Sequence, residues 1–149
     1  MYIPIHFASL SKFFKIMLVL LSVFLCLSVQ ASADVTIDDG DDGTYYTGTW
    51  VTSGGSSPYN GHSLWSRDGA TYTWSFDGEP SGTYEVFMWW SGYASRASAI
   101  PVDIHHAGGT DRLSVNQQEN AGQWNRLGSF YFESSGGVTI TAAEGSTAS

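Results

Sequence analysis

Apolar and polar residues alternate with a period of two over most of the chain beyond Asp34, and no stretch of ten residues carries the apolar stripe of a helix. In segment 70–76, Ala, Tyr, Trp and Phe share one face, while threonine and serine hydroxyls occupy the other. Successive side chains of a strand point to opposite faces, so this pattern indicates half-buried β-strands. Turn clusters rich in glycine separate eight or nine such segments at a spacing of about ten residues, which predicts an antiparallel β-sandwich or barrel.

The expected strands differ in how much apolar surface they carry. Segment 83–91 has large apolar side chains on both faces, which predicts a central strand whose two faces are both partly covered. Gly108-Gly109 predicts a tight hairpin between two of the strands. The strands are expected at 35–37, 45–51, 62–66, 70–76, 83–91, 100–106, around Leu113 and Val115, and at 124–132 and 138–142.

The first 33 residues have the pattern of an export signal. Lys12 and Lys15 precede the apolar run 16–29, and Ala31-Ser32-Ala33 offers a small-residue cleavage site. The sequence therefore predicts a signal peptide over 1–33 and a secreted, extracellular domain over 34–149, the alternative being an uncleaved anchor. Cleavage would remove Cys26, which is the chain's only cysteine, so the remaining domain would fold without disulfides.

Charge narrows the range of partners. Both lysines lie in the signal segment, so residues 34–149 contain four arginines against fourteen acidic residues and carry a formal net charge of −10. Nucleic acid and anionic membrane surfaces attract clustered Lys and Arg, and this balance argues against both. Charged residues make up only 13% and aromatic residues 15% of the chain, with 17 glycines, which favours one folded, turn-rich domain over disorder.

An ordered set of motifs runs through the domain. These are Ile37-Asp38-Asp39-Gly40-Asp41, Thr47-Gly48-Thr49-Trp50, Tyr84-Glu85-Val86, Trp90, Arg96, His105-His106-Ala107-Gly108-Gly109-Thr110, Asn116-Gln117-Gln118, Gly122-Gln123-Trp124-Asn125 and Leu127-Gly128. Together they closely resemble the golvesin / xanthan lyase carbohydrate-binding-like domain over most of residues 35–142. The resemblance implies a galactose-binding-like jelly roll, which usually occurs as a non-catalytic module on secreted bacterial enzymes.

The C-terminal end of the pattern differs from the resembled family. The last alternating residues are Val138, Ile140 and Ala142, and residues 144–149 are small and polar, whereas domains of that family continue into one more apolar strand. We therefore expect a C-terminally incomplete sandwich that lacks its last strand and leaves a groove or an open sheet edge. The alternative is a family variant whose polar tail simply frays.

Aromatic and amide side chains suggest a platform for a glycan. Sugars stack their C–H faces on aromatic rings, while amides and arginine read their hydroxyls. Trp50, Tyr59, Trp65 and Tyr93 lie in or beside predicted loops. Adjacent strand residues such as Trp89 and Trp90 point to opposite faces, so at most one of these two fills the core. The predicted ligand-binding residues are Trp89, Trp90, Tyr93, Arg96, Gln117, Gln118 and Trp124, with Gln123 as a further polar candidate.

Each of these residues also has a structural interpretation. The aromatic rings could fill the core. The Gln amides could bond neighbouring backbone, and Arg96 could pair with Asp103 or Glu85.

Carboxylates at Asp38, Asp39 and Asp41, with Gly40 between them, suggest a calcium loop. The alternative is a solvated acidic turn, because no glutamate closes the loop as in an EF-hand. No other cofactor is expected.

Catalytic patterns are missing from the sequence. There is no Gly-x-Ser-x-Gly elbow, and no spacing singles out a pair of carboxylates for glycoside hydrolysis. The sequence thus predicts a secreted, non-catalytic module that binds an extracellular or cell-wall polysaccharide. The alternative is a structural or adhesive module that binds an enzyme domain or a host protein without affinity for sugar.

Overall fold

The computed structural model describes residues 34–143 and 145–149, so the predicted signal segment lies outside the described residues. Their strands are β1 (Thr44–Tyr46), β2 (Val51–Thr52), β3 (Leu64–Trp65), β4 (Thr71–Asp77), β5 (Gly82–Met88), β6 (Ile100–His106), β7 (Gly109–Val115), β8 (Asn125–Phe132) and β9 (Ser135–Thr141). A single turn of 3-10 helix, η1 (Tyr59–Gly61), stands between β2 and β3. Within this part of the chain, no helix is long and apolar enough to span a membrane.

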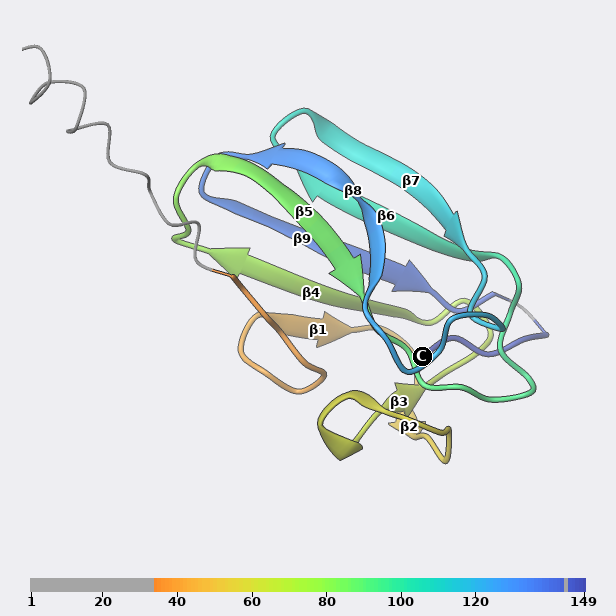
Figure 1. Cartoon of the computed structure of the whole chain (residues 1–149). Coiled ribbons are helices and arrows are strands. Elements are labelled where there is room, and N and C mark those ends of the chain that lie inside the picture. Colours follow the sequence, from red (N-terminus) through yellow and green to blue (C-terminus); the bar gives the residue numbers. More distant parts are fainter. Residues whose placement is uncertain (1–33, 144) are drawn as a thin grey trace, which may run out of the picture. The chain divides into compact units, whose positions relative to one another are not determined.

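The strands form two layers (Figure 1). One layer is a five-stranded sheet in the order β1-β4-β9-β6-β7, and β5 and β8 pair across it in the other layer, with the short β2–β3 pair at one end. All pairs of neighbouring strands are antiparallel. The predicted all-β antiparallel sandwich is therefore confirmed.

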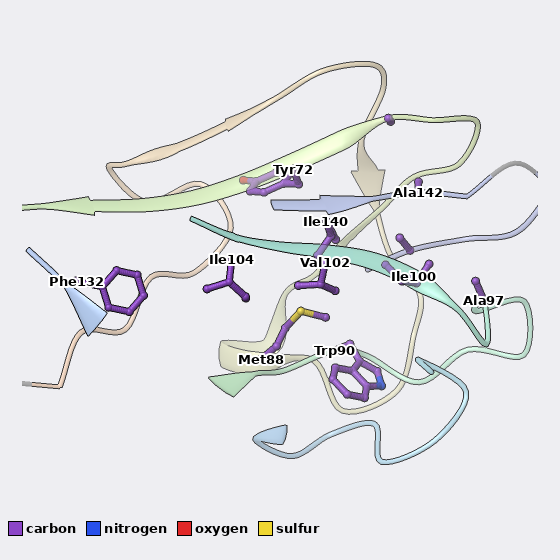
Figure 2. Packing of buried hydrophobic residues seen from close by; sticks show 12 residues of the cluster. Tyr72, Met88, Trp90, Ala97, Ile100, Val102, Ile104, Phe132, Ile140 and Ala142 are labelled. Atoms are coloured by element: carbon purple, nitrogen blue, oxygen red, sulfur yellow. The ribbon is translucent and has the colours of Figure 1, made fainter. Parts of the chain in front are cut away.

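The core lies between these two layers, and β6 contributes alternate side chains to it. Ile100, Val102 and Ile104 of β6 are fully buried, and in Figure 2 Met88 from the end of β5 points toward Val102. Trp90 lies beside them, below Ile100. Burying a side chain of this size stabilises the fold by roughly 1.5–3 kcal/mol, so the alternation in β6 provides much of the stability.

Two of the predicted strands near the N-terminus are wrong. Residues 35–37 form no strand, and the segment 45–51 breaks into β1 and β2. The break lies at Gly48, whose φ of +72° favours glycine and where a Cβ would lie 2.7 Å from that of Ala70.

Strand β5 is an edge strand, which corrects its prediction as a central one. It pairs with β8 alone, and no other described strand bonds to its second edge. Phe87, whose bulk suggested a covered second face, is 44% exposed.

The last residues of the chain contact segments that lie beyond the end of β5. Ala148 bridges to Ser66 and Thr147 to Arg96, and Thr147 and Ala148 are both buried. Beside Ala148, the Ser149 hydroxyl lies 3.0 Å from that of Ser91, just beyond the end of β5. That the sandwich lacks a last strand stays a prediction.

Candidate functional site

Three aromatic rings from three different loops meet where β5 ends and β8 begins. Tyr59 belongs to η1, Trp89 directly follows β5, and Trp124 directly precedes β8. The ring centroids are 5.6 Å apart for Tyr59 and Trp89, 5.1 Å for Tyr59 and Trp124, and 5.7 Å for Trp89 and Trp124. Trp124 is 46% exposed, and the other two rings are half-buried beside it. We call these three residues the aromatic trio.

Backbone contacts hold the loops of the aromatic trio together. The indole N–H of Trp89 donates to the Ser57 carbonyl oxygen at 3.0 Å, and Ser56 and Gly92 exchange two backbone hydrogen bonds of 2.8 and 2.9 Å. A Cβ at Gly122, where φ is +76°, would lie 2.7 Å from the Ser57 Cβ, so only glycine allows the third loop to approach this closely. The three rings are therefore carried on a fixed backbone.

Backbone strain also gathers in these loops. Among the described residues, four that are not glycine have positive φ, and Ser57 (53°), Asn60 (47°) and Asn120 (53°) lie in loops of the aromatic trio. The left-handed region is costly for residues with a Cβ, and such residues persist where surrounding contacts enforce them, often at binding sites.

Arg96 lies inside the protein behind these loops. It is 2% exposed, and its Nε donates to the Ser91 carbonyl oxygen at 3.1 Å. Its Nη2 donates to the hydroxyls of Ser53 at 2.9 Å and Ser91 at 2.8 Å, and its Nη1 to Thr147 Oγ1 at 3.2 Å. Burial lowers the pKa of Arg96 to about 10, which still leaves it charged at neutral pH. We call Arg96 and these three hydroxyl residues the Arg96 hub.

The hub corrects both interpretations of Arg96 from the sequence. Its guanidinium is covered and bonded within the protein, so it does not present itself to a ligand. It does not pair with Asp103 or Glu85 either, because Arg112 binds Asp103 at 2.7 Å and Arg126 binds Glu85 at 2.9 Å. The hub instead ties the loop after β2 to the segment after β5.

Two further predicted ligand-binding residues are buried. Gln117 is fully buried and exchanges hydrogen bonds with the backbone of Ser149. Trp90 is 4% exposed, and its indole N–H donates to the Glu119 carbonyl oxygen at 3.0 Å. Both predictions are corrected, because a polymer outside the protein cannot reach these covered groups.

The other predicted residues are spread over the surface. Gln118 is exposed, but its Nε2 donates to the Arg96 carbonyl oxygen at 2.8 Å, and it lines a shallow cavity of about 380 Å³ with the small residues around 94–99. Tyr93 is exposed and stacks on none of the described aromatic rings. The structure thus brings together Trp89 and Trp124 from the predicted set and adds Tyr59. The sequence indicated that Tyr59 could belong to the site only through its position in a predicted loop, directly after Pro58.

The acidic loop folds back on itself rather than around a common point. The Asp38 N–H donates to Asp41 Oδ2 at 2.8 Å, and the Asp39 N–H donates to Asp38 Oδ1 at 2.9 Å. Asp39 Oδ2 lies 3.0 Å from His62 Nδ1. Burial, with the adjacent Asp38, raises the pKa of Asp39 to about 6. Residues 34–143 and 145–149 contain no group of three or more His, Cys, Asp or Glu side chains placed to hold a metal ion.

This geometry favours the acidic turn, and the calcium loop can be tested directly. We expect millimolar calcium to leave the melting temperature unchanged, because the carboxylates of Asp38 and Asp41 already bond the turn. A site with a dissociation constant one hundredth of the calcium concentration would instead add about 2.7 kcal/mol to the free energy of unfolding. A rise in melting temperature with calcium that disappears in the Asp39→Asn variant would instead show that the loop binds calcium.

Comparison with known proteins gives related results from sequence and structure. The sequence profile of the family described as Golvesin C-terminal domain matches residues 35–149. The xanthan lyase of Bacillus sp. (strain GL1) is 31% identical over 113 residues, which are 72% of this chain and 12% of that protein. The solved structure of a Paenibacillus xanthan lyase superposes with a TM-score of 0.69 at 33% identity, covering 75% of this chain and 12% of that one. The chain thus spans about an eighth of the length of each lyase.

Proposed function

Because the chain belongs to the Golvesin C-terminal domain family, we propose that it is a secreted, non-catalytic module that binds a polysaccharide through the aromatic trio. The observation that carries the proposal is the meeting of three rings on braced loops, with Trp124 open to solvent. The chain matches only 12% of each of two xanthan lyases, which supports a module that accompanies a polysaccharide-cleaving enzyme and does not itself cleave the polymer.

The physical basis is stacking on a surface that is already formed. Sugar rings present apolar C–H faces, which pack on the faces of Trp and Tyr. Trp89 and Tyr59 pack against the Trp124 ring. The Asn125 Nδ2 donates to the carbonyl oxygens of Asn120 at 3.0 Å and Gln123 at 2.9 Å, which fixes the backbone around Trp124. A surface that needs no ordering on binding keeps more of the interaction energy as affinity.

A second candidate function rests on a different surface. Phe87 and Tyr131 are 44% and 52% exposed on the outer face of the β5–β8 pair, beside the open edge of β5. Exposed aromatic side chains on a sheet face are also typical of protein–protein contacts. A protein-interaction module would use this face and leave the aromatic trio unused.

Two alanine variants separate the two functions. Trp124→Ala is expected to remain folded and to weaken polysaccharide binding at least tenfold, a change that corresponds to about 1.4 kcal/mol. Tyr131→Ala removes an equally exposed aromatic from the other surface and should bind as the unaltered chain does. Circular dichroism checks the fold, and affinity electrophoresis against polysaccharides chosen from a glycan array measures binding. Unchanged retardation of a folded Trp124→Ala variant would remove the aromatic trio from the site.

A further inference from the structure

The loops that carry the aromatic trio, at 53–63, 89–99 and 116–124, offer no arginine or lysine that is free to meet an acidic ligand. Arg96 is buried in its hub, and Arg67 lies over the Trp65 ring at 4.8 Å. Arg112 and Arg126 are each paired with a carboxylate. Residues 34–149 contain no lysine. Proteins that recognise carboxylates on a ligand usually do so with a free arginine fork or a lysine.

Carboxylates, in contrast, lie on or beside the loops that carry the aromatic trio. Asp38 Oδ2 accepts a hydrogen bond of 3.2 Å from Asn60 Nδ2, next to Tyr59 in η1. His62, which follows η1, faces Asp39 at 3.0 Å, so its charge when protonated is balanced there. Glu119 is exposed on the loop that leads to Trp124. Two carboxylates, Asp38 and Glu119, therefore belong to segments that contact or carry members of the aromatic trio.

We infer that the ligand of the aromatic trio is an uncharged polysaccharide, and that the module discriminates against chains bearing carboxylates. This inference rests on the proposed function and adds the chemical class of the ligand. A net charge of −10 over residues 34–149 repels an acidic polymer at long range, and Asp38 and Glu119 repel it at the site. Both effects are screened over about 10 Å at 0.1 M salt, so the discrimination is strongest at low ionic strength. The stacking of sugar rings on the aromatic trio, in contrast, does not depend on ionic strength.

The test compares two forms of one polymer. Xanthan, which is acidic, is used in its native form and after its carboxylates have been reduced to hydroxymethyl groups, so that backbone and linkage stay the same. At low salt, the chain is expected to bind the reduced polymer at least tenfold more tightly than the native one, and added salt should narrow the gap. Equal or tighter binding of native xanthan would overturn the inference while leaving the proposed function standing.

A pair of matched variants locates the effect. Glu119→Gln is expected to bind native xanthan more tightly than the unaltered chain does. Glu133→Gln makes the same change of charge beyond the other end of β8 and should not. If both variants gain equally, the site-specific part of the inference is wrong. If Trp124→Ala binds both polymers as tightly as the unaltered chain does, the proposed function fails, and the inference fails with it.

Discussion

Replacing Trp90 with alanine is expected to lower the free energy of unfolding by about 3–5 kcal/mol, which is the usual cost of removing a large buried aromatic side chain. Trp90 is 4% exposed, lies in the core beside Met88 and donates its indole N–H to the Glu119 carbonyl oxygen. Alanine would leave a cavity and an unpaired carbonyl group at once. Against a typical total stability of about 5–15 kcal/mol, such a loss brings the domain close to unfolding.

Thermal melts followed by circular dichroism measure this effect. Tyr93→Ala serves as the control, because Tyr93 is exposed and three residues away along the chain. We expect its melting curve to follow that of the unaltered chain. A Trp90→Ala variant that melts together with the control would contradict the burial of Trp90 and return it to the set of surface residues.

Replacing Arg96 with alanine is expected to have a similar cost, about 3–5 kcal/mol, for a different reason. The guanidinium makes four hydrogen bonds within the hub, and its loss would remove one bond from each of the hydroxyls of Ser53, Ser91 and Thr147 and one from the Ser91 carbonyl oxygen. The cost combines these unmade bonds with the cavity. Arg96→Lys keeps the charge, but the lysine side chain cannot reach three separate hydroxyls. Its free energy of unfolding should therefore lie between that of the unaltered chain and that of Arg96→Ala.

Polysaccharide binding should be lost together with stability in Arg96→Ala, because Ser53 and Ser91 belong to segments that adjoin Tyr59 and Trp89. Denaturant unfolding and affinity electrophoresis, both run below the melting temperature of the variant, measure the two losses. Arg112→Ala is the control, since Arg112 lies at the surface on β7, and it should change neither quantity. An Arg96→Ala variant as stable as this control would show that the hub is dispensable.

The sandwich could be predicted because strands carry their own pattern. In β4 and β6, alternate residues face the core, and the predicted segments 70–76 and 100–106 agree with the structure to within a residue. For strand β5, the alternation did not predict correctly which side chains are covered. Phe87 has the bulk of a buried side chain yet faces solvent, and only the partners of a strand, which lie elsewhere in the sequence, decide whether its second face is covered.

The candidate site was predicted only in part, because it depends on contacts between distant segments. Tyr59 meets Trp124 across 65 positions, and no local pattern records that meeting. The predicted ligand-binding role of Arg96 was wrong for a related reason. A lone arginine in a loop is usually exposed, and the three hydroxyls that allow its burial come from positions 53, 91 and 147.

The open edge of β5 has a consequence for the association of copies of this chain. An unpaired edge is a template on which another strand can form, and two copies joined antiparallel about the middle of β5 would build one continuous sheet. Glu85 stands at that middle position, so such a pairing would place two carboxylates directly opposite each other. Like charges opposed across a strand pair are destabilising. Glu85 therefore disfavours the pairing of two copies at this edge, and its ion pair with Arg126 moderates the repulsion.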